Sequence, residues 1–368
     1  IAFKFLAAAA VVLTTSAWSD SGSLESRAQA LLDAAREENN LAGMTAGIAK
    51  KGEIVWVGAT GFQDIANEIP ANPEMVHRIA SISKPMTAVG AMRLVEYGSM
   101  KLDDPLRKYI TEMPETPMGE IQIMHLLTHT SGIKHYTGND SRPFTHYATL
   151  TDACDFILNR RSGIAVPPLD RYIYTTYGYT VLALAMERAA GVPYAEYMRD
   201  YIWLPAGMRD TIVEVKGVDV PNKSKLYRKD ADGNIEEDDY TDLSVKTGGG
   251  GIQSTAPDLL RFAIAFEGEK LIKRELMDQM LTIPPLNNPR SDNRPQYGFG
   301  WNVGNNKSLG SIIAHSGGQS GTSTYLLIGR DHDIAVSVLC NTAGTGAPAN
   351  LAYSLARLAA GVPEPTED

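Results

Sequence analysis

The N-terminal part of the chain shows a helical pattern followed by a strand pattern. Residues 23–39 place apolar side chains at helical spacing among charged ones, which predicts a surface helix. Residues 44–49 and 54–59 are short apolar runs separated by Lys-Lys-Gly-Glu at 50–53, which predicts a β-hairpin. The chain therefore opens with one helix and two antiparallel strands.

The middle of the chain is predicted to be helical. Residues 85–95 are apolar on nearly every side, which is typical of a buried helix, and we expect this helix to begin at Ser81 and stop near Gly98. Residues 101–240 should be mostly helical, with loops marked by prolines. Strongly apolar helices are predicted there at 179–190 and 194–204.

The last third of the chain returns to strands. A glycine run at 248–251 leads to Ser-Thr-Ala-Pro-Asp at 254–258, a capped helix start. An Arg-Asp-His-Asp turn at 330–333 indicates a second hairpin, and an amphipathic helix is predicted at 349–360. Strand-like runs occur at 297–303, 311–314, 324–328 and 334–340.

These patterns predict an α+β fold. Its antiparallel sheet would be built from both ends of the chain and flanked by terminal helices, with an inserted helical subdomain. We assign residues 18–100 and 241–368 to the sheet subdomain and residues 101–240 to the helical one. Since 368 residues exceed the size that one simple core favours, we expect two subdomains around one cleft.

Charge and the N-terminal segment bear on where the protein acts. The formal net charge is −9 and no basic stripe overrides it, so we expect no nucleic-acid partner. Residues 1–17 have the pattern of a secretory signal peptide, with Lys4 before an apolar stretch too short to span a bilayer. We therefore expect a periplasmic or secreted protein with no stable membrane insertion after signal cleavage.

The chain has two cysteines, Cys154 and Cys340. An exported protein could bridge them. Cys340 ends a strand-like run, whereas Cys154 lies in a helix-like segment, so two separately buried thiols are the preferred interpretation and the bridge stays open.

Ser81 and Lys84 form the most informative pair of polar residues. A serine hydroxyl needs a nearby base to act as a nucleophile at neutral pH. Lys84 follows one helical turn later on the same helix face, where a surrounding core would desolvate the amine and lower its pKa. The spacing therefore places a hydroxyl and a potentially neutral amine together at the end of a core helix.

Other motifs in the chain have simpler explanations. Ser131-Gly132-Ile133-Lys134 repeats the Ser-x-x-Lys spacing but lies in a turn-like stretch, which favours a turn or cap role for Ser131. His125 and His129 are four residues apart, yet the glutamate of a zinc-binding H-E-x-x-H motif is absent. We expect both histidines to be hydrogen-bonded structural residues.

Several stretches together resemble the serine β-lactamase and penicillin-binding-protein superfamily, in the branch that holds class C β-lactamases, DD-peptidases and esterases. The resemblance covers almost the whole mature chain, and its motifs look most like those of LACTB-type proteins. The stretches are Arg78–Pro85, His125–Gly132, Tyr174–Tyr179, Gly249–Thr255 and His315–Gly318.

The resemblance implies a role for each matching residue. Ser81 would be the acylated nucleophile, Lys84 its proton partner, and Tyr174 a residue sharing the general-base role. The backbone N–H groups of Ser81 and Gly318 would form the oxyanion hole. The third motif of the family would be His315-Ser316-Gly317, and Thr176 would complete the second motif.

Two residues depart from the family pattern. Thr176 stands where asparagine is usual, and threonine lacks the second group of an amide. His315 replaces a lysine with a residue that, if unperturbed, titrates near neutrality. Both changes argue against efficient β-lactam hydrolysis and leave acyl transfer possible.

Two further motifs are set aside. Lys246-Thr247-Gly248 and Ser291-Asp292-Asn293 spell motifs of class A β-lactamases, but they come in the wrong order. His315 follows an apolar strand, where the third motif belongs, whereas Lys246 leads into a glycine turn.

The sequence thus predicts an exported serine hydrolase that acts on a small-molecule or peptide-like acyl substrate, an ester or amide, without a cofactor or metal. The alternatives are a catalytically weak penicillin-recognising or scaffold protein of the same fold, and a metallohydrolase that uses the histidines. The acyl group, the leaving group and the oligomeric state stay open.

Overall fold

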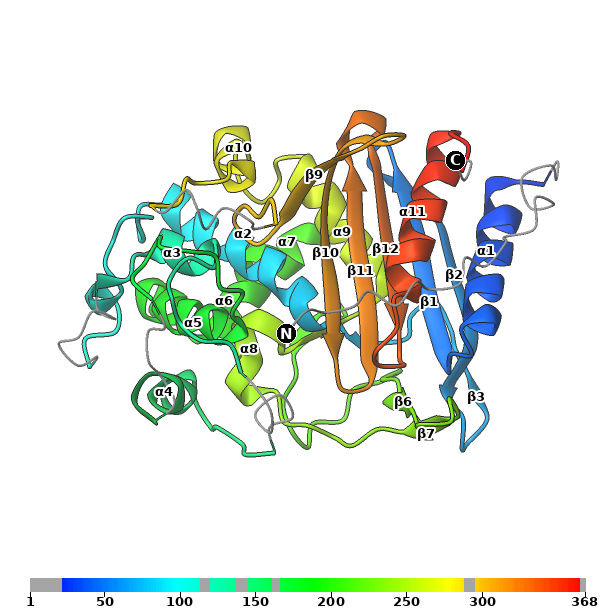
Figure 1. The fold of residues 1–368 in the computed structure, drawn as a ribbon, viewed down its shortest axis with the longest axis horizontal. Helices are drawn as coiled ribbons and strands as arrows, with labels where there is room; N and C mark the ends of the chain where they lie inside the picture. Colours follow the sequence, from blue (N-terminus) through cyan, green and yellow to red (C-terminus); the bar gives the residue numbers. More distant parts are fainter. Residues whose placement is uncertain (1–21, 113–119, 137–143, 161–165, 288–294, 365–368) are drawn as a thin grey trace, which may run out of the picture.

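A seven-stranded antiparallel sheet forms the centre of the computed structural model, which describes residues 22–112, 120–136, 144–160, 166–287 and 295–364 (Figure 1). The strand order is β3-β2-β1-β12-β11-β10-β9. Because β1 pairs with β12, both ends of the chain build one sheet, as predicted. The strands are β1 (Gly43–Lys50), β2 (Glu53–Asp64), β3 (Ile69–Pro70), β9 (Asn302–Asn306), β10 (Gly310–Gln319), β11 (Thr322–Gly329) and β12 (Ile334–Cys340).

Helices cover both faces of this sheet. The terminal helices α1 (Leu24–Glu38) and α11 (Ala347–Ala360) lie side by side on one face (Figure 1). Their apolar residues form one core with β1, β11 and β12. Helix α9 (Ala256–Glu267) packs on the opposite face, and its N-cap Thr255 accepts a hydrogen bond from the Asp258 N–H, which confirms the predicted capped start.

A second, larger core joins the sheet to the helical part of the chain. Helix α2 (Ser83–Glu96) is buried on nearly every side, as its apolar sequence predicts. It packs against α5 (Thr176–Ala190), another strongly apolar helix. Shorter helices complete this part: α3 (Ile123–Leu127), α4 (Leu150–Asp155), α6 (Tyr194–Met198), α7 (Leu204–Ala206), α8 (Thr247–Gly250) and α10 (Arg274–Leu281).

Two expectations about secondary structure were wrong. The region 101–240 is not mostly helical, since irregular segments join its helices and three short strands occur in it: β5 (Ile212–Val213), β6 (Tyr227–Lys229) and β7 (Ile235–Glu237). The strand expected at 297–303 is β9, which begins only at Asn302. Gly300 with φ +79° turns the chain just before it. The boundaries between the two subdomains stay a prediction.

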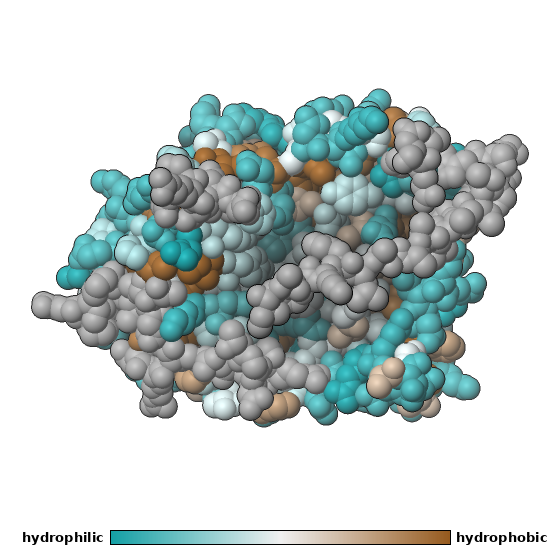
Figure 2. All heavy atoms as spheres, viewed as in Figure 1, coloured by the Kyte–Doolittle hydropathy of each residue, from teal (hydrophilic) through white to brown (hydrophobic). Residues whose placement is uncertain are grey.

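The predicted signal peptide at 1–17 lies outside the described residues, as does Ser291. Within the described ranges, the structure has no helix both long and apolar enough to cross a membrane. Figure 2 shows a mainly hydrophilic face with separate small hydrophobic areas. Cys154 and Cys340 are both free and buried, which confirms two separate thiols.

Candidate active site

Ser81 lies in a tight turn of 3₁₀ helix, Ala80–Ile82, that leads directly into α2. Ala80 has a left-handed backbone with φ +48°, a strained conformation for a residue with a side chain. The sheet holds this turn in place: Thr322 donates to the carbonyl of Arg78 at 2.8 Å, and Thr324 donates to that of Ile79 at 3.0 Å. The strained turn presents Ser81 at a part-exposed position.

Lys84 is completely buried and has three polar neighbours. Its Nζ atom lies 3.0 Å from Ser81 Oγ, 3.2 Å from Thr176 Oγ1 and 2.7 Å from the carbonyl oxygen of Gly249. A neutral amine has two N–H bonds and one lone pair. The bonds to Thr176 and Gly249 use both hydrogens, so the lone pair faces the hydroxyl of Ser81.

The surroundings of Lys84 favour this neutral form. Burial holds the pKa of the Lys84 amine well below its usual range, because the charged form loses its hydration. The nearby charge of Lys246 lowers it further. The arrangement can therefore remove a proton from Ser81 at neutral pH, as the spacing of the two residues suggested.

Tyr174 lies beside both the nucleophile and the lysine. Its hydroxyl is hydrogen-bonded to Ser81, and Lys84 Nζ sits 4.6 Å from the centre of its ring. Burial raises the pKa of the Tyr174 phenol, so the hydroxyl stays protonated at neutral pH. This favours a proton-donating role over the shared general-base role that the resemblance implied.

Thr176 is the first residue of α5 and is turned toward the lysine. Its side-chain oxygen accepts from Lys84, and its backbone N–H donates to His135 Nδ1 at 3.1 Å. Burial, together with the charge of Lys246, lowers the pKa of His135 to about 4. His135 is thus a neutral acceptor beside the site.

His315 lies on β10 with both ring nitrogens occupied. Nδ1–H donates to the carbonyl of Ser316 at 2.7 Å, and Nε2 accepts from the Tyr297 hydroxyl at 3.0 Å. Burial lowers the pKa of His315 to about 3, because the charged imidazolium would lose its hydration. The expectation that it titrates near neutrality is therefore wrong, and it replaces the family lysine with an uncharged group.

The glycines after His315 bring β10 against the nucleophile turn. A Cβ on Gly317 would lie 2.4 Å from the carbonyl oxygen of Ile79, so only glycine allows this approach. Gly318 and Ser316 alternate with it and are exposed, and a Cβ on Gly318 would meet nothing within 4 Å. The side of Gly318 from which a side chain would project is therefore open, and its role in an oxyanion hole stays a prediction.

The cleft continues along β10. Strand β9 pairs with β10 only over Gly310–Ala314, so the stretch from His315 to Gln319 has no ladder partner on that side among the described strands. A hollow opens beside Gly318, although Ser81 and Lys84 are not among the residues that line it. It is lined by Tyr136, Arg228, Lys229, Asp238, Gly318, Gln319, Ser320 and the loop 343–346.

Three further residues belong to the site although the sequence analysis did not assign them to it. Gly249 accepts from Lys84, and His135 accepts from Thr176. Lys246, set aside with its class A-like motif, is buried, with its Nζ 4.4 Å from the Tyr136 ring centre, and its charge acts on Lys84. The glycine run after Lys246 was the sequence feature that could have indicated this packing, because glycine permits close approach of two backbones.

The structural roles expected for three residues are confirmed. Ser131 Oγ accepts from the Ile133 N–H at 3.3 Å, a turn contact. His125 Nδ1 accepts from the Gln122 N–H at 3.0 Å, and His129 Nδ1 accepts from the Thr175 N–H at 3.2 Å. In the described part of the chain, no three His, Cys, Asp or Glu side chains are grouped to hold a metal.

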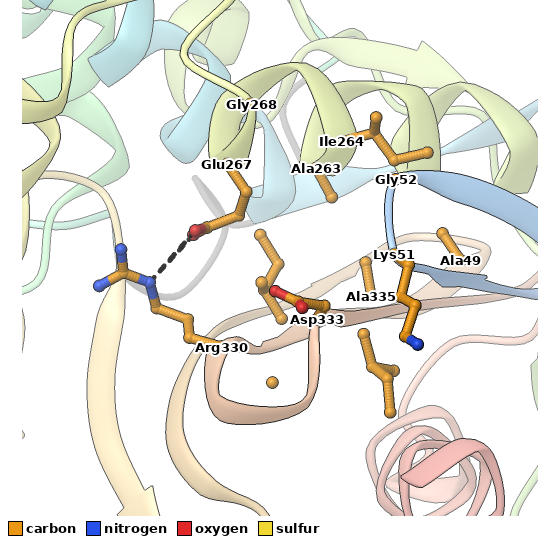
Figure 3. Close-up of a pocket in the computed structure, with 13 residues that line it drawn as sticks. Ala49, Lys51, Gly52, Ala263, Ile264, Glu267, Gly268, Arg330, Asp333 and Ala335 are labelled. Atoms are coloured by element: carbon orange, nitrogen blue, oxygen red, sulfur yellow. Dashed lines mark hydrogen bonds and ion pairs between the residues drawn. The ribbon is translucent and has the colours of Figure 1, made fainter.

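Another pocket lies at the opposite end of β11 from Thr322 and Thr324 (Figure 3). Its floor is apolar, and its rim carries Lys51, Asp333 and the ion pair of Arg330 with Glu267, 3.1 Å apart. None of the site residues lines this pocket, so it is separate from the nucleophile.

The chain matches known proteins over nearly its whole length. A family model described as Beta-lactamase matches residues 28–361. Penicillin-binding protein 4* of Bacillus subtilis is 29% identical over 306 residues, which are 80% of this chain and 66% of that protein. The human mitochondrial serine beta-lactamase-like protein LACTB is 27% identical, over 86% of this chain and 76% of that protein.

A solved structure shares the fold. The D-amino acid amidase of Ochrobactrum anthropi aligns with a TM-score of 0.77 at 20% identity, over 92% of this chain and 98% of that one. The matched span includes the nucleophile turn, α5 and β10, which carry the site described above. The chain belongs to the Beta-lactamase family, within the superfamily of serine β-lactamases and penicillin-binding proteins.

Proposed function

We propose that this protein is a serine hydrolase that transfers an acyl group from an ester or peptide-like amide to Ser81 and then to water. One observation carries the proposal: Ser81 Oγ lies 3.0 Å from the amine of the fully buried Lys84, whose pKa burial holds well below its usual range. Once the amine is neutral, its contacts to Thr176 and Gly249 take both hydrogens and leave the lone pair for the nucleophile.

The reaction follows from the geometry. Lys84 takes the proton of Ser81 as Oγ attacks the acyl carbon, and the N–H groups of Ser81 and Gly318 stabilise the oxyanion. Tyr174 donates a proton to the leaving oxygen or nitrogen, and the proton that Lys84 took from Ser81 then returns to the Tyr174 oxygen, beside whose ring Lys84 Nζ lies. Water then attacks the acyl-enzyme by the reverse route and releases the acid, which leaves Ser81 protonated.

Esters are the favoured substrates over β-lactams. The hydroxyl of Thr176 is already bound to Lys84, so no side-chain amide at this position is available to a β-lactam. The unpaired stretch of β10 would suit a peptide-like acyl group, which can pair with a strand edge. Among the relatives, esterase EstB of Burkholderia gladioli is 32% identical over 52% of this chain, which agrees with ester hydrolysis.

A hydrolysis panel tests the proposal. Wild type and Ser81→Ala are compared on p-nitrophenyl esters, nitrocefin and D- and L-aminoacyl amides, with a fluorophosphonate probe to label the nucleophile. Turnover and labelling that both depend on Ser81 support the hydrolase. A protein labelled by penicillin without turnover of any substrate would be a penicillin-recognising protein instead, and inhibition by chelators would indicate a metallohydrolase.

We further propose that the protein acts after export, in the periplasm or outside the cell, on the strength of the signal-like residues 1–17. Expression with and without this segment, followed by fractionation, checks the location. Recovery of the processed form outside the cytoplasm is expected, and retention of both forms inside would contradict export.

A further inference from the structure

His129 is bound to both chain neighbours of Tyr174. Its backbone carbonyl accepts from the Ile173 N–H at 2.8 Å, and its ring nitrogen Nδ1 accepts from the Thr175 N–H at 3.2 Å. One residue thus fixes the backbone immediately before and after the tyrosine. A shift of Tyr174 along or across the chain would break at least one of these bonds.

The His129 ring also packs against Tyr174 itself. The two ring centres lie 4.3 Å apart, and the His129 ring is 4.8 Å from that of Tyr297, whose hydroxyl binds His315. The ring therefore fills the space between the second and third motifs of the site. It is fully buried, so it is not placed to touch a substrate directly.

The backbone of His129 is left-handed, with φ +58°. Residues with side chains seldom adopt this conformation. Here it turns the chain so that the carbonyl and the ring of one residue both meet the segment 173–175. The backbone and the side chain of His129 thus hold the same segment in place.

The ring is neutral. Burial holds the pKa of His129 well below its usual range. Only a neutral imidazole has a free lone pair on Nδ1, so the bond to the Thr175 N–H persists across the working pH range.

We propose that His129 is a positioning residue that holds the Tyr174 hydroxyl at Ser81. This inference rests on the proposed function, in which Tyr174 donates the proton to the leaving group. Its consequence is that loss of the Nδ1 acceptor slows proton transfer and leaves substrate binding almost unchanged.

Two variants separate the acceptor from the ring. His129→Phe keeps a ring and removes the acceptor, whereas His129→Asn keeps an acceptor and tolerates the left-handed backbone. With a p-nitrophenyl ester we expect His129→Phe to lower kcat by roughly 10- to 100-fold with KM changed by about 2-fold or less. His129→Asn should lose clearly less. Equal losses, or a loss only in KM, would overturn the inference.

A double-mutant cycle then shows whether His129 acts through Tyr174. If it does, His129→Phe adds almost nothing to the effect of Tyr174→Phe, because the hydroxyl that it positions is already gone. If the double variant instead lowers kcat by the product of the two single effects, His129 acts elsewhere and the inference is overturned. Circular dichroism checks folding, and if His129→Phe does not fold, the same cycle with His129→Asn decides.

The two proposals fail differently. If wild type and Ser81→Ala hydrolyse nothing in the panel, the hydrolase function is wrong. If wild type is active and Tyr174→Phe is slow while His129→Phe matches wild type, only the positioning role is wrong.

Discussion

Lys84 Nζ donates to the carbonyl oxygen of Gly249 at 2.7 Å, a contact that depends on the glycine itself. A Cβ on Gly249 would lie 2.8 Å from the carbonyl oxygen of Thr176, and one on Gly248 would lie 2.5 Å from that of Tyr179. Helix α8 therefore packs directly on the backbone of α5. This packing brings a carbonyl to the lysine from a segment far away in the sequence.

Gly249→Ala should displace α8 and weaken the hydrogen bond from Lys84 to the carbonyl oxygen of residue 249. We expect at least ~10-fold lower kcat, together with a lower Tm, since the Thr176 carbonyl oxygen is a backbone atom and cannot rotate away. Gly250→Ala is the matched control, because its Cβ would meet its nearest atom at 3.6 Å, an ordinary contact. Equal effects of the two substitutions would mean that the tight packing is not what matters.

Ser81→Ala should abolish both turnover and probe labelling, with a loss of order 10³-fold or more. Ser131→Ala removes the other serine of a Ser-x-x-Lys sequence, whose side chain accepts from the Ile133 N–H. It should keep most of the activity and lose only ~1 kcal/mol of stability. Comparable damage from Ser131→Ala would reassign the nucleophile.

Lys84→Met should inactivate the enzyme and yet stabilise the fold. The unfolded lysine is protonated at neutral pH, whereas the folded one is neutral, so folding releases a proton against its preference. Methionine removes that cost and fits among Tyr174 and Tyr179. Thermal unfolding of both proteins measures the effect, with a Tm rise of about 2 °C or more expected at neutral pH.

The direction in which stability changes with pH supplies a second check on the protonation state of Lys84. Because the folded pKa is depressed, the unfolded state binds more protons, and wild-type stability rises with pH. The gain in stability of Lys84→Met over wild type should therefore decrease as the pH approaches the ordinary lysine pKa, about 10.4. A constant or growing advantage would mean that the folded lysine is charged.

His315 should give no pH-dependent selectivity near neutrality. Its pKa of about 3 leaves it uncharged there, so a carboxylated ester and its neutral counterpart should keep a constant ratio of kcat/KM between about pH 6 and 8. His315→Lys adds a cation and should raise the ratio in favour of the carboxylated substrate. A wild-type ratio that falls through this range would show that His315 titrates there.

Thr176→Asn should reduce the difference in kcat/KM between esters and nitrocefin. Asparagine restores a side-chain amide at the position where the Thr176 hydroxyl now accepts from Lys84. We expect kcat/KM for nitrocefin to rise relative to that for the best ester, and Thr180→Asn on the same helix serves as a control. A wild type that hydrolyses nitrocefin as fast as the best ester would contradict the preference.

The periodic segments of the sequence predicted the frame of the molecule well. The spacing of apolar residues located α1, α2 and α11 and both hairpins, because each buries one face or is buried on every side. The pairing of Ser81 with Lys84 also followed from one helical turn. These features depend on local geometry, which a sequence displays directly.

The properties of the site that depend on distant residues were not visible in the sequence. His315 was expected to titrate near neutrality, but burial by segments distant in the sequence holds it neutral. Lys246 was set aside, since nothing local shows that α8 packs beside α5. Both errors come from electrostatics and packing between segments more than sixty residues apart, such as Lys84 and Lys246.

The hydroxyls of Thr322 and Thr324 that hold the nucleophile turn have a consequence for the time at which activity arises. They lie on β11, far along the chain from the turn that they hold, which lies near residue 80. A nascent chain therefore carries its serine long before the strand that orients it has been synthesised. The long sequence separation predicts slow folding and a chain that is inert until β11 is present.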